Sequence, residues 1–539
     1  MSFSNNPQTQ AAGSSTSSTP SIHRIHWLGL ALTLVFLLVI FGRPITLPWT
    51  EEDNYYGALY SQAAHNNLRA GLWVTGSVPS TLYFGPLPIP PDQFYVHHPS
   101  LLPLSVTAAF AVFGEHEWAA RLVPIFCSLA SLTFLWLIVA HAVGARAATF
   151  TGLVFAFMPM ELHYGDVVNF EPCTMTPMLA ALWGIQRWQA TARLGGAWFA
   201  ALGCLLSLWM DWPGYLFTLS LAGWLLWRPG ARWMAGVLLL LVLISGTGFM
   251  LQIRWVNADA WSNLWTALMV RVGNGVTSGS DAVTTTGPHF TTVEWLATVG
   301  RNIFENFHPL PLALALVGTV ILLLRRRAAA GLRWLGWAAL STFTTGVVYV
   351  VIFRNESFIH DFAPFYLIAA IAMTSGLALD TAWEAVARQS QAIRFLSRTA
   401  LVALLAVLAT LGCRSSQAMR SQSLILDGDT PEPANLIPAL GQQLHDTFTP
   451  NTVILLNIDP YGSTLNYYTQ RSLLNNLDTA DDWKGWMAEV SPAGGVIWLD
   501  APGAAQILAA LPASEIQRIK VEGIPFAFWV PANARATAK

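Results

Sequence analysis

Residues 119–141 have the sequence AARLVPIFCSLASLTFLWLIVAH, in which Arg121 is the only Asp, Glu, Lys or Arg side chain. About 20 consecutive, mostly apolar residues form an α-helix long enough to cross the hydrocarbon core of a membrane. The rest of the chain has the same character, because 54% of its 539 residues are hydrophobic and only 11% are charged. Soluble proteins contain roughly 25% charged residues. The stretch and the composition therefore predict an integral membrane protein.

Other apolar runs along the chain are long enough, or nearly long enough, to cross a membrane. They cover residues 26–42, 146–162, 172–188, 195–210, 212–227, 233–253, 309–324, 334–353, 362–379 and 399–413. Together with 119–141, they predict a polytopic α-helical membrane protein with about eleven transmembrane helices. The run at 100–113 would span only about 21 Å, so we expect an interfacial or re-entrant helix there.

The arginines predict the orientation of these helices. If the N-terminus lies inside the cell, thirteen arginines fall in or beside the short cytoplasmic segments and seven in the much longer outer segments. Cytoplasmic loops of membrane proteins are rich in Lys and Arg, so this orientation is favoured. It places the long loops 43–118 and 254–308 outside the inner (plasma) membrane. Sixteen of the eighteen acidic residues before residue 414 also lie outside, which indicates that the chemistry takes place there.

The two ends of the chain differ from the transmembrane domain at 26–413. Residues 1–25 begin with a stretch rich in Ser, Thr, Asn and Gln, which predicts a disordered cytoplasmic tail. Residues 414–539 mix polar sequence with strand-like segments at 453–456 and 495–499, which predicts a small, soluble, extracytoplasmic α/β domain. The net charge of −2 offers no basic surface for a nucleic acid, so nucleic-acid binding is excluded.

Three adjacent acids, Glu51, Glu52 and Asp53, follow the first apolar run. Neighbouring carboxylates repel one another, so at least one of them is a candidate for a raised pKa and for general-base chemistry. Acids also stabilise the positive end of a helix, and a helix is predicted directly after this cluster. The spacing leaves both interpretations open.

Further polar groups stand at the predicted outer ends of the apolar runs. His97 and His98 precede the short run at 100–113, where a His pair either binds phosphate or metal or is structural. Arg121 enters its span from the outer side and needs a partner there. Glu171 precedes Pro172 at the start of the apolar run 172–188, so it either caps that membrane span or lines a cavity together with the first acids. Arg354 and His360 offer cations close to the interface, where a lipid phosphate would lie.

The order of these motifs resembles the GT-C superfamily of glycosyltransferases that use polyprenyl-phosphate sugars, especially bacterial relatives of the protein O-mannosyltransferases and of the aminoarabinose transferase acting on lipid A. Four segments carry the resemblance: Glu52-Asp53-Asn54-Tyr55-Tyr56, His98-Pro99-Ser100, Gly114 to Arg121, and Glu171-Pro172. The family has Asp where this chain has Glu52 and Glu171, and Pro where it has Ser100. The position of the catalytic carboxylate is therefore open among Glu51, Glu52 and Asp53.

The resemblance implies a GT-C-like fold and transfer, with inversion, of a hexosyl or pentosyl group to a lipid, glycan or protein acceptor outside the membrane. It assigns the base to Glu52 or Asp53, with support from Glu171. The implied substrate-binding residues are Glu51, Tyr56, His97, His98, Arg121, Arg301, Arg354 and His360. No cofactor is firmly implied, although a divalent cation, Mg²⁺ or Mn²⁺, stays open.

Two other classes of function are weighed against the glycosyltransferase. A transporter would show paired halves and charges near the middle of its spans, and the chain has neither feature. A scaffold that only presents the C-terminal domain would not need the acidic loops. The sequence names neither the sugar nor the acceptor.

Overall fold

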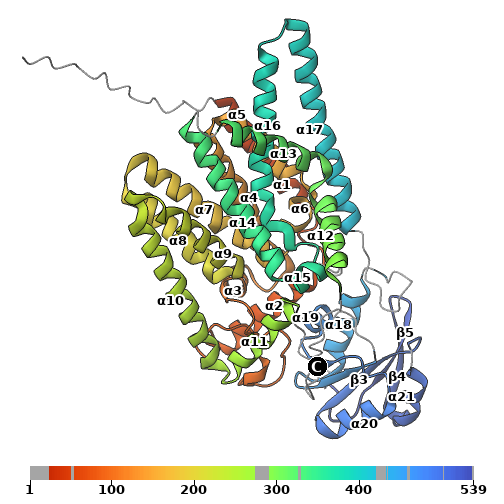
Figure 1. The fold of residues 1–539 in the computed structure, drawn as a ribbon. Coiled ribbons are helices and arrows are strands. Elements are labelled where there is room, and N and C mark those ends of the chain that lie inside the picture. The colour runs from red at the N-terminus through yellow and green to blue at the C-terminus, as the bar shows by residue number, and fades with distance from the viewer. Residues whose placement is uncertain are drawn as a thin grey trace, which may run out of the picture.

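A computed structural model describes residues 24–49, 54–273, 290–325, 329–420, 433, 435–457, 462–501 and 503–536. Most of the chain forms a helical bundle, and each apolar run predicted from the sequence is largely helical (Figure 1). The helices of the bundle are α1 (Arg24–Gly42), α2 (Asn54–Ala70), α3 (Leu101–Phe113), α4 (Glu117–Ala142), α5 (Ala145–Phe157), α6 (Pro159–Tyr164), α7 (Phe170–Thr191), α8 (Leu194–Met210), α9 (Trp212–Leu226), α10 (Arg232–Val256), α11 (Ala260–Arg271), α12 (Thr292–Phe307), α13 (Pro309–Arg325), α14 (Ala330–Ile352), α15 (Arg354–Ile359), α16 (Ile368–Ala387) and α17 (Gln391–Arg420).

Several of these helices have the length and composition of membrane spans. Among the described residues, five are long and apolar enough to cross a membrane: α4, α10 with the turn before it, α14, α16 with the turn before it, and α17. Helices α12 and α13 pass the same test as a pair and are bent by 93° at their junction, so they count as a sixth if they form one span. The polytopic helical class is therefore confirmed, and the count of about eleven spans stays a prediction.

Close packing of α7 against α8 brings two acidic residues to the same end of the bundle. If residue 184 had a side chain, its Cβ atom would lie only 2.7 Å from the backbone nitrogen of Ala200, so only glycine fits there. Small residues at such contacts let two helix backbones approach closely. Because the two helices run in opposite directions, Glu171 at the start of α7 and Asp211 after the end of α8 lie at the same end. We call this end of the bundle the site end.

The C-terminal domain adjoins the site end (Figure 1). Its five strands, β1 (Val453–Leu456), β2 (Ser472–Leu474), β3 (Ala493–Trp498), β4 (Ile516–Val521) and β5 (Ile524–Trp529), form a sheet in the order β2-β1-β3-β5-β4. β1 pairs in parallel with β2 and β3, whereas β5 pairs antiparallel with β3 and β4. The helices are α18 (Leu436–Thr447), α19 (Gly462–Thr469), α20 (Ala480–Glu489) and α21 (Ala504–Ala510). The predicted small α/β domain is confirmed.

The helix that contains the last apolar run, 399–413, extends beyond that run at both ends. Helix α17 continues past residue 413 to Arg420, whose guanidinium forms an ion pair with the buried carboxylate of Asp166. The loop between α16 and α17 lies at the opposite end of the bundle from the C-terminal domain (Figure 1). The last turn of α17 is therefore tied to the site end.

Candidate functional site

A buried histidine–aspartate pair forms one side of the site. The Nδ1 atom of His98 lies 2.8 Å from Oδ1 of Asp211, and the hydroxyl of Tyr366 donates to Oδ2 of Asp211 at 3.4 Å. The ring of His98 stacks on Phe170, with 4.4 Å between ring centroids. A carboxylate on one ring nitrogen fixes the orientation of an imidazole and directs the other nitrogen elsewhere. His98 is therefore held in one orientation, with Nε2 on the side away from Asp211.

An ion-paired cluster forms a second side. Arg271, the last residue of α11, has its Nε atom 3.3 Å from Oε2 of Glu356, and Nε2 of His360 lies 3.7 Å from the other oxygen of that carboxylate. Burial raises the pKa of Glu356, but the charges of Arg271 and His360 outweigh this effect, so the pKa lies below its usual value. The hydroxyl of Tyr56 reaches Nδ1 of His360 at 3.4 Å. Charged and polar groups from α2, α11 and α15 therefore meet here.

Arg271 also acts on the histidine pair. Burial, followed by the nearby charges of Arg271 and His98, lowers the pKa of His97 from 6.5 to about 3. Burial and the charge of Arg271 lower the pKa of His98 as well, although Asp211 acts in the opposite direction. Both imidazoles are therefore neutral near pH 7, and Arg271 carries the permanent positive charge of the site.

Glu171 lies in the first turn of α7, where Asn169 caps the helix by accepting a hydrogen bond from the backbone N–H of Phe170 at 2.9 Å. Because Asn169 is the capping residue, Glu171 is not needed for that task. Its side chain is 4% exposed, and within the described residues its Oε2 atom has no hydrogen-bond partner. A buried carboxylate oxygen without a partner is costly unless a substrate or ion completes the site.

The predicted acidic cluster, Glu51, Glu52 and Asp53, lies outside the described residues. The residues on both sides of it are described, and Arg121 holds them together. The guanidinium of Arg121 donates to the carbonyl oxygens of Ile45 and Leu47 and, at 3.3 Å, to the side chain of Asn54. It also lies 4.0 Å from the ring centroid of Trp49. Arg121 therefore fixes the ends of the segment that carries the acids.

Two predicted phosphate contacts lie apart from this cluster. Arg354 donates from Nη2 to the hydroxyl of Thr292 at 3.0 Å and packs its guanidinium 5.0 Å from the ring centroid of Trp295, so it ties α15 to α12. Arg301 is an exposed residue of α12 with no hydrogen bond or ion pair shown in the described part of the chain. The structure thus brings together Tyr56, His97, His98, Glu171 and His360, with Arg121 beside the acidic segment.

Three residues of the site were not selected from the sequence: Asp211, Arg271 and Glu356. Asp211 stands in the sequence as a single residue between the apolar runs 195–210 and 212–227. Arg271 stands in a long loop among other arginines, and nothing in its neighbours distinguishes it from Arg301. Its half-buried position beside Glu356 is seen only in the tertiary structure, where α11 packs against α15.

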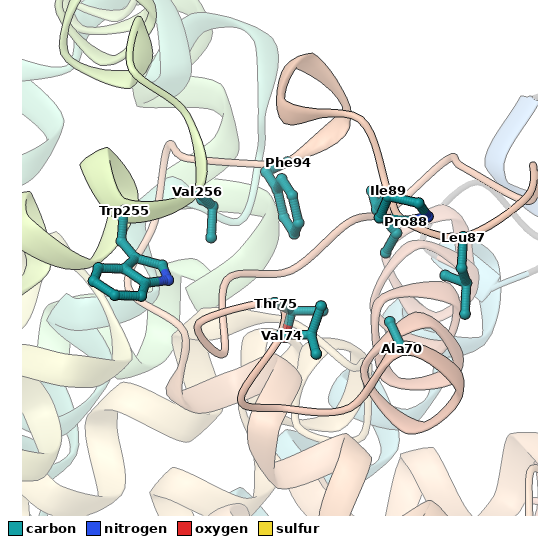
Figure 2. A pocket seen from close by; sticks show the side chains of 9 residues that line it. All are labelled: Ala70, Val74, Thr75, Leu87, Pro88, Ile89, Phe94, Trp255 and Val256. Atoms are coloured by element: carbon teal, nitrogen blue, oxygen red, sulfur yellow. The ribbon is translucent and has the colours of Figure 1, made fainter.

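An apolar pocket of about 380 Å³ lies beside the site end (Figure 2). Val74, Phe94 and Trp255 face it together with Leu87 and Ile89, and Thr75 is the only hydroxyl-bearing residue in its lining. None of the predicted site residues lines this pocket, whose lining is mostly apolar.

Comparisons with known proteins agree with the fold. Residues 97–255 match the family described as dolichyl-phosphate-mannose-protein mannosyltransferase. A search of curated protein sequences finds no match. Among solved structures, ArnT from Cupriavidus metallidurans in the apo state has a TM-score of 0.64 at 15% identity, with 95% of this chain and 99% of that chain covered.

Two further solved structures show the same fold with a bound ligand. ArnT from Cupriavidus metallidurans bound to undecaprenyl phosphate has a TM-score of 0.64 at 15% identity, covering 96% of this chain and 100% of that chain. A second structure is the archaeal oligosaccharyltransferase AglB from Archaeoglobus fulgidus, in complex with an inhibitory peptide and a dolichol-phosphate. It has a TM-score of 0.54 at 13% identity, with 88% of this chain and 70% of that chain covered. The resemblance to GT-C glycosyltransferases stated from the sequence is confirmed.

Proposed function

We propose that the protein is a membrane glycosyltransferase that moves a sugar, with inversion, from a polyprenyl-phosphate donor to an acceptor outside the membrane. The observation that carries the proposal is the meeting of a half-buried permanent cation, Arg271, with a buried, oriented imidazole, His98, and a buried carboxylate, Glu171, whose Oε2 has no hydrogen-bond partner among the described residues. Such a set suits a reaction that releases an anionic phosphate and consumes a hydroxyl proton. The solved relatives that hold undecaprenyl phosphate and dolichol-phosphate support this class of donor.

The reaction has one bond made and one broken. The acceptor oxygen bonds to the anomeric carbon, and the bond between that carbon and the phosphate oxygen breaks with its electron pair leaving on the phosphate. The hydroxyl proton passes to a carboxylate. Attack from the face opposite the leaving phosphate inverts the anomeric centre. The protein therefore has to supply a base on one side and positive charge on the other.

The positive side is assigned to Arg271 and His360, while His98 is neutral near pH 7. Arg271 is the group among them whose charge does not depend on pH, and its salt bridge to Glu356 holds it in place. In the neutral ring of His98 the Nδ1–H donates to Asp211, so Nε2 is an acceptor for a substrate hydroxyl. The expected contacts from Arg354 and Arg301 stay secondary candidates, since their side chains contact α12 or lie exposed.

The base is assigned to Glu52 or Asp53, with Glu51 as the neighbouring alternative and Glu171 as support. Burial of Glu171 near Asp211 and Glu356 places three acids within electrostatic reach of one another. A carboxylate among other acids holds a proton more readily than an isolated one. That property suits a group that takes the proton from the hydroxyl of the substrate that receives the sugar.

A divalent cation is a further proposal. In the described part of the chain no group of three His, Cys, Asp or Glu side chains could hold a metal ion, so a site would need the acids at 51–53 beside Glu171. Carboxylate oxygens are the ligands that Mg²⁺ and Mn²⁺ prefer, and Oε2 of Glu171, which has no hydrogen-bond partner in the described part of the chain, fits that requirement. A bound cation would add positive charge for the phosphate.

The test is release of polyprenyl phosphate from a labelled polyprenyl-phosphate sugar by the purified full-length protein with a panel of acceptors. We expect release by the wild-type protein and a large loss in Glu171→Gln, which keeps the size of the side chain. Saturable binding of the donor without any release would contradict the enzyme proposal and favour a transporter.

A further inference from the structure

Two cysteines that the proposed reaction does not use lie side by side near the site end. Cys127 belongs to α4, and Cys173 belongs to the first turn of α7, two residues after Glu171. A hydrogen bond joins their thiols, and both cysteines are free in the structure. Two thiols that touch across a contact between helices are placed for a disulfide, which forms only where the two side chains point toward each other.

Contacts between the hydroxyls and backbone of α4 and α7 show the same placement independently of the thiols. The hydroxyl of Thr176 donates to the backbone carbonyl of Cys127 at 2.6 Å. The hydroxyls of Thr176 and Ser131 lie 2.8 Å apart. Residues three and four apart share one face of a helix, so Cys173 and Thr176 lie on one face of α7, and Cys127 and Ser131 on one face of α4. These bonds therefore hold the two cysteines opposite each other.

The two thiols differ in their access to a reagent. Cys173 is 0% exposed, whereas Cys127 is half-buried and follows Phe126, which is 72% exposed. Thiol–disulfide exchange proceeds through a mixed disulfide between the oxidant and a thiol that the oxidant reaches, and a second thiol then resolves it. Cys127 is suited to the first task, and Cys173, which touches it, is suited to the second.

We propose that Cys127 and Cys173 are a redox-active pair whose disulfide fixes the first turn of α7, which carries Glu171, to α4. The Cys127 sulfur attacks one sulfur of an oxidant that is itself a disulfide, and the Cys173 sulfur then displaces the oxidant's sulfur from Cys127. Two S–H bonds are lost and one S–S bond forms, while the oxidant takes up the two electrons and two protons and becomes two thiols.

The proposed orientation places this pair toward the outer side of the membrane, where conditions are oxidising and disulfides persist. The disulfide would close a loop that contains α5 and α6. Closing a long loop restricts the unfolded chain more than the folded one, so oxidation should raise the melting temperature. The inference concerns a site of covalent modification and does not depend on the proposed glycosyltransferase function.

Peptide mapping of the purified full-length protein tests the inference. The probe is dipyridyl disulfide, a small apolar oxidant of the disulfide class, followed by denaturation, alkylation of free thiols and mass spectrometry. We expect a cross-linked peptide pair containing Cys127 and Cys173, with Cys204 of α8 and Cys413 of α17 alkylated. The matched controls Cys204→Ser and Cys413→Ser should give the same cross-link. Separate pyridyl adducts on Cys127 and Cys173, two free thiols, or a cross-link to Cys204 or Cys413 would overturn the pairing.

Hydrogen exchange tests whether the disulfide holds the start of α7. The amides of residues 174–176 should exchange more slowly in the oxidised wild type than in the reduced wild type, and dithiothreitol should restore the faster exchange. The same treatment should leave exchange unchanged in Cys127→Ser, which has no partner for Cys173. Equal exchange in the oxidised and reduced wild type would overturn the fixing of α7. Because neither measurement uses the donor, failure of the glycosyltransferase proposal would leave both results decisive.

Discussion

His98 and Asp211 are joined by a 2.8 Å contact between Nδ1 and Oδ1, although they come from the loop before α3 and the break between α8 and α9. Asp211→Asn keeps the size of the side chain and removes its charge. Hydrogen bonds to charged groups are worth about 1.5–3 kcal/mol, so we expect turnover to fall by roughly ten- to a hundredfold. The measurement is kcat for release of polyprenyl phosphate. Tyr366→Phe, which removes only the 3.4 Å bond to Oδ2, should have a smaller effect, and equal effects would argue against an orienting role.

A second prediction separates Arg271 from Arg354 as the phosphate contact. Arg271→Gln should weaken donor binding by about 1.5–3 kcal/mol, because a charge-assisted contact to phosphate is lost. Since this change leaves the carboxylate of Glu356 without its partner, the double variant Arg271→Gln with Glu356→Gln serves as the folding control. Arg354→Gln should bind the donor almost normally. If Arg354→Gln loses affinity for the donor and the double variant does not, Arg354 of α15 contacts the donor phosphate and Arg271 does not.

A third prediction concerns the base. Glu51→Gln, Glu52→Gln and Asp53→Asn keep size and remove charge, and a positioned base contributes about 10²- to 10⁴-fold to proton transfer. At least one of these variants should lower kcat by about 10²- to 10⁴-fold without lowering the melting temperature. A capping role would instead cost about 1 kcal/mol of stability and leave turnover intact. Normal turnover in all three variants would make the cluster structural.

A fourth prediction concerns pH and His97. The pKa of His97 falls from 6.5 in the unfolded chain to about 3 in the folded protein, mainly through burial. Between these values the unfolded chain binds the proton and the folded protein does not, so stability is lost as the pH falls below 6.5. His97→Asn should therefore show a smaller drop in melting temperature between pH 7 and pH 5 than the wild type does. His116→Asn, at an exposed position, should behave like the wild type. An equal drop in all three proteins would show that His97 does not carry this effect.

The fifth prediction concerns orientation, which rests on the distribution of arginines. Asp481→Cys, at an exposed position of α20, should react with a membrane-impermeant thiol reagent in intact spheroplasts, and Ala330→Cys should not. The four native cysteines are buried or half-buried, so the unmodified protein gives the background. Reversed labelling would place the C-terminal domain inside the cell.

The helical bundle was predictable from local sequence. A run such as 119–141 must be helical in a membrane, because only a helix satisfies its own backbone groups there. The small α/β domain was predictable for a related reason, since strands such as Val453–Leu456 are short apolar runs bounded by polar residues. The helices and the strands were both predictable because each depends on the pattern of apolar and polar residues that are close together in the chain.

The site could be predicted only in part. His98 and Glu171 could be predicted because a His pair and an acid followed by Pro stand at the ends of apolar runs, which is a local signal. Arg271 and Asp211 carry no such signal, and only the return of α11 toward α15 and the antiparallel packing of α7 against α8 made them part of the site. The sequence by itself determined the apolar helices of the bundle and the two strand-like segments at 453–456 and 495–499. The tertiary structure alone decided which charges meet, because the contacts between His98 and Asp211 and between Tyr468 and Trp49 join residues 113 and 419 positions apart.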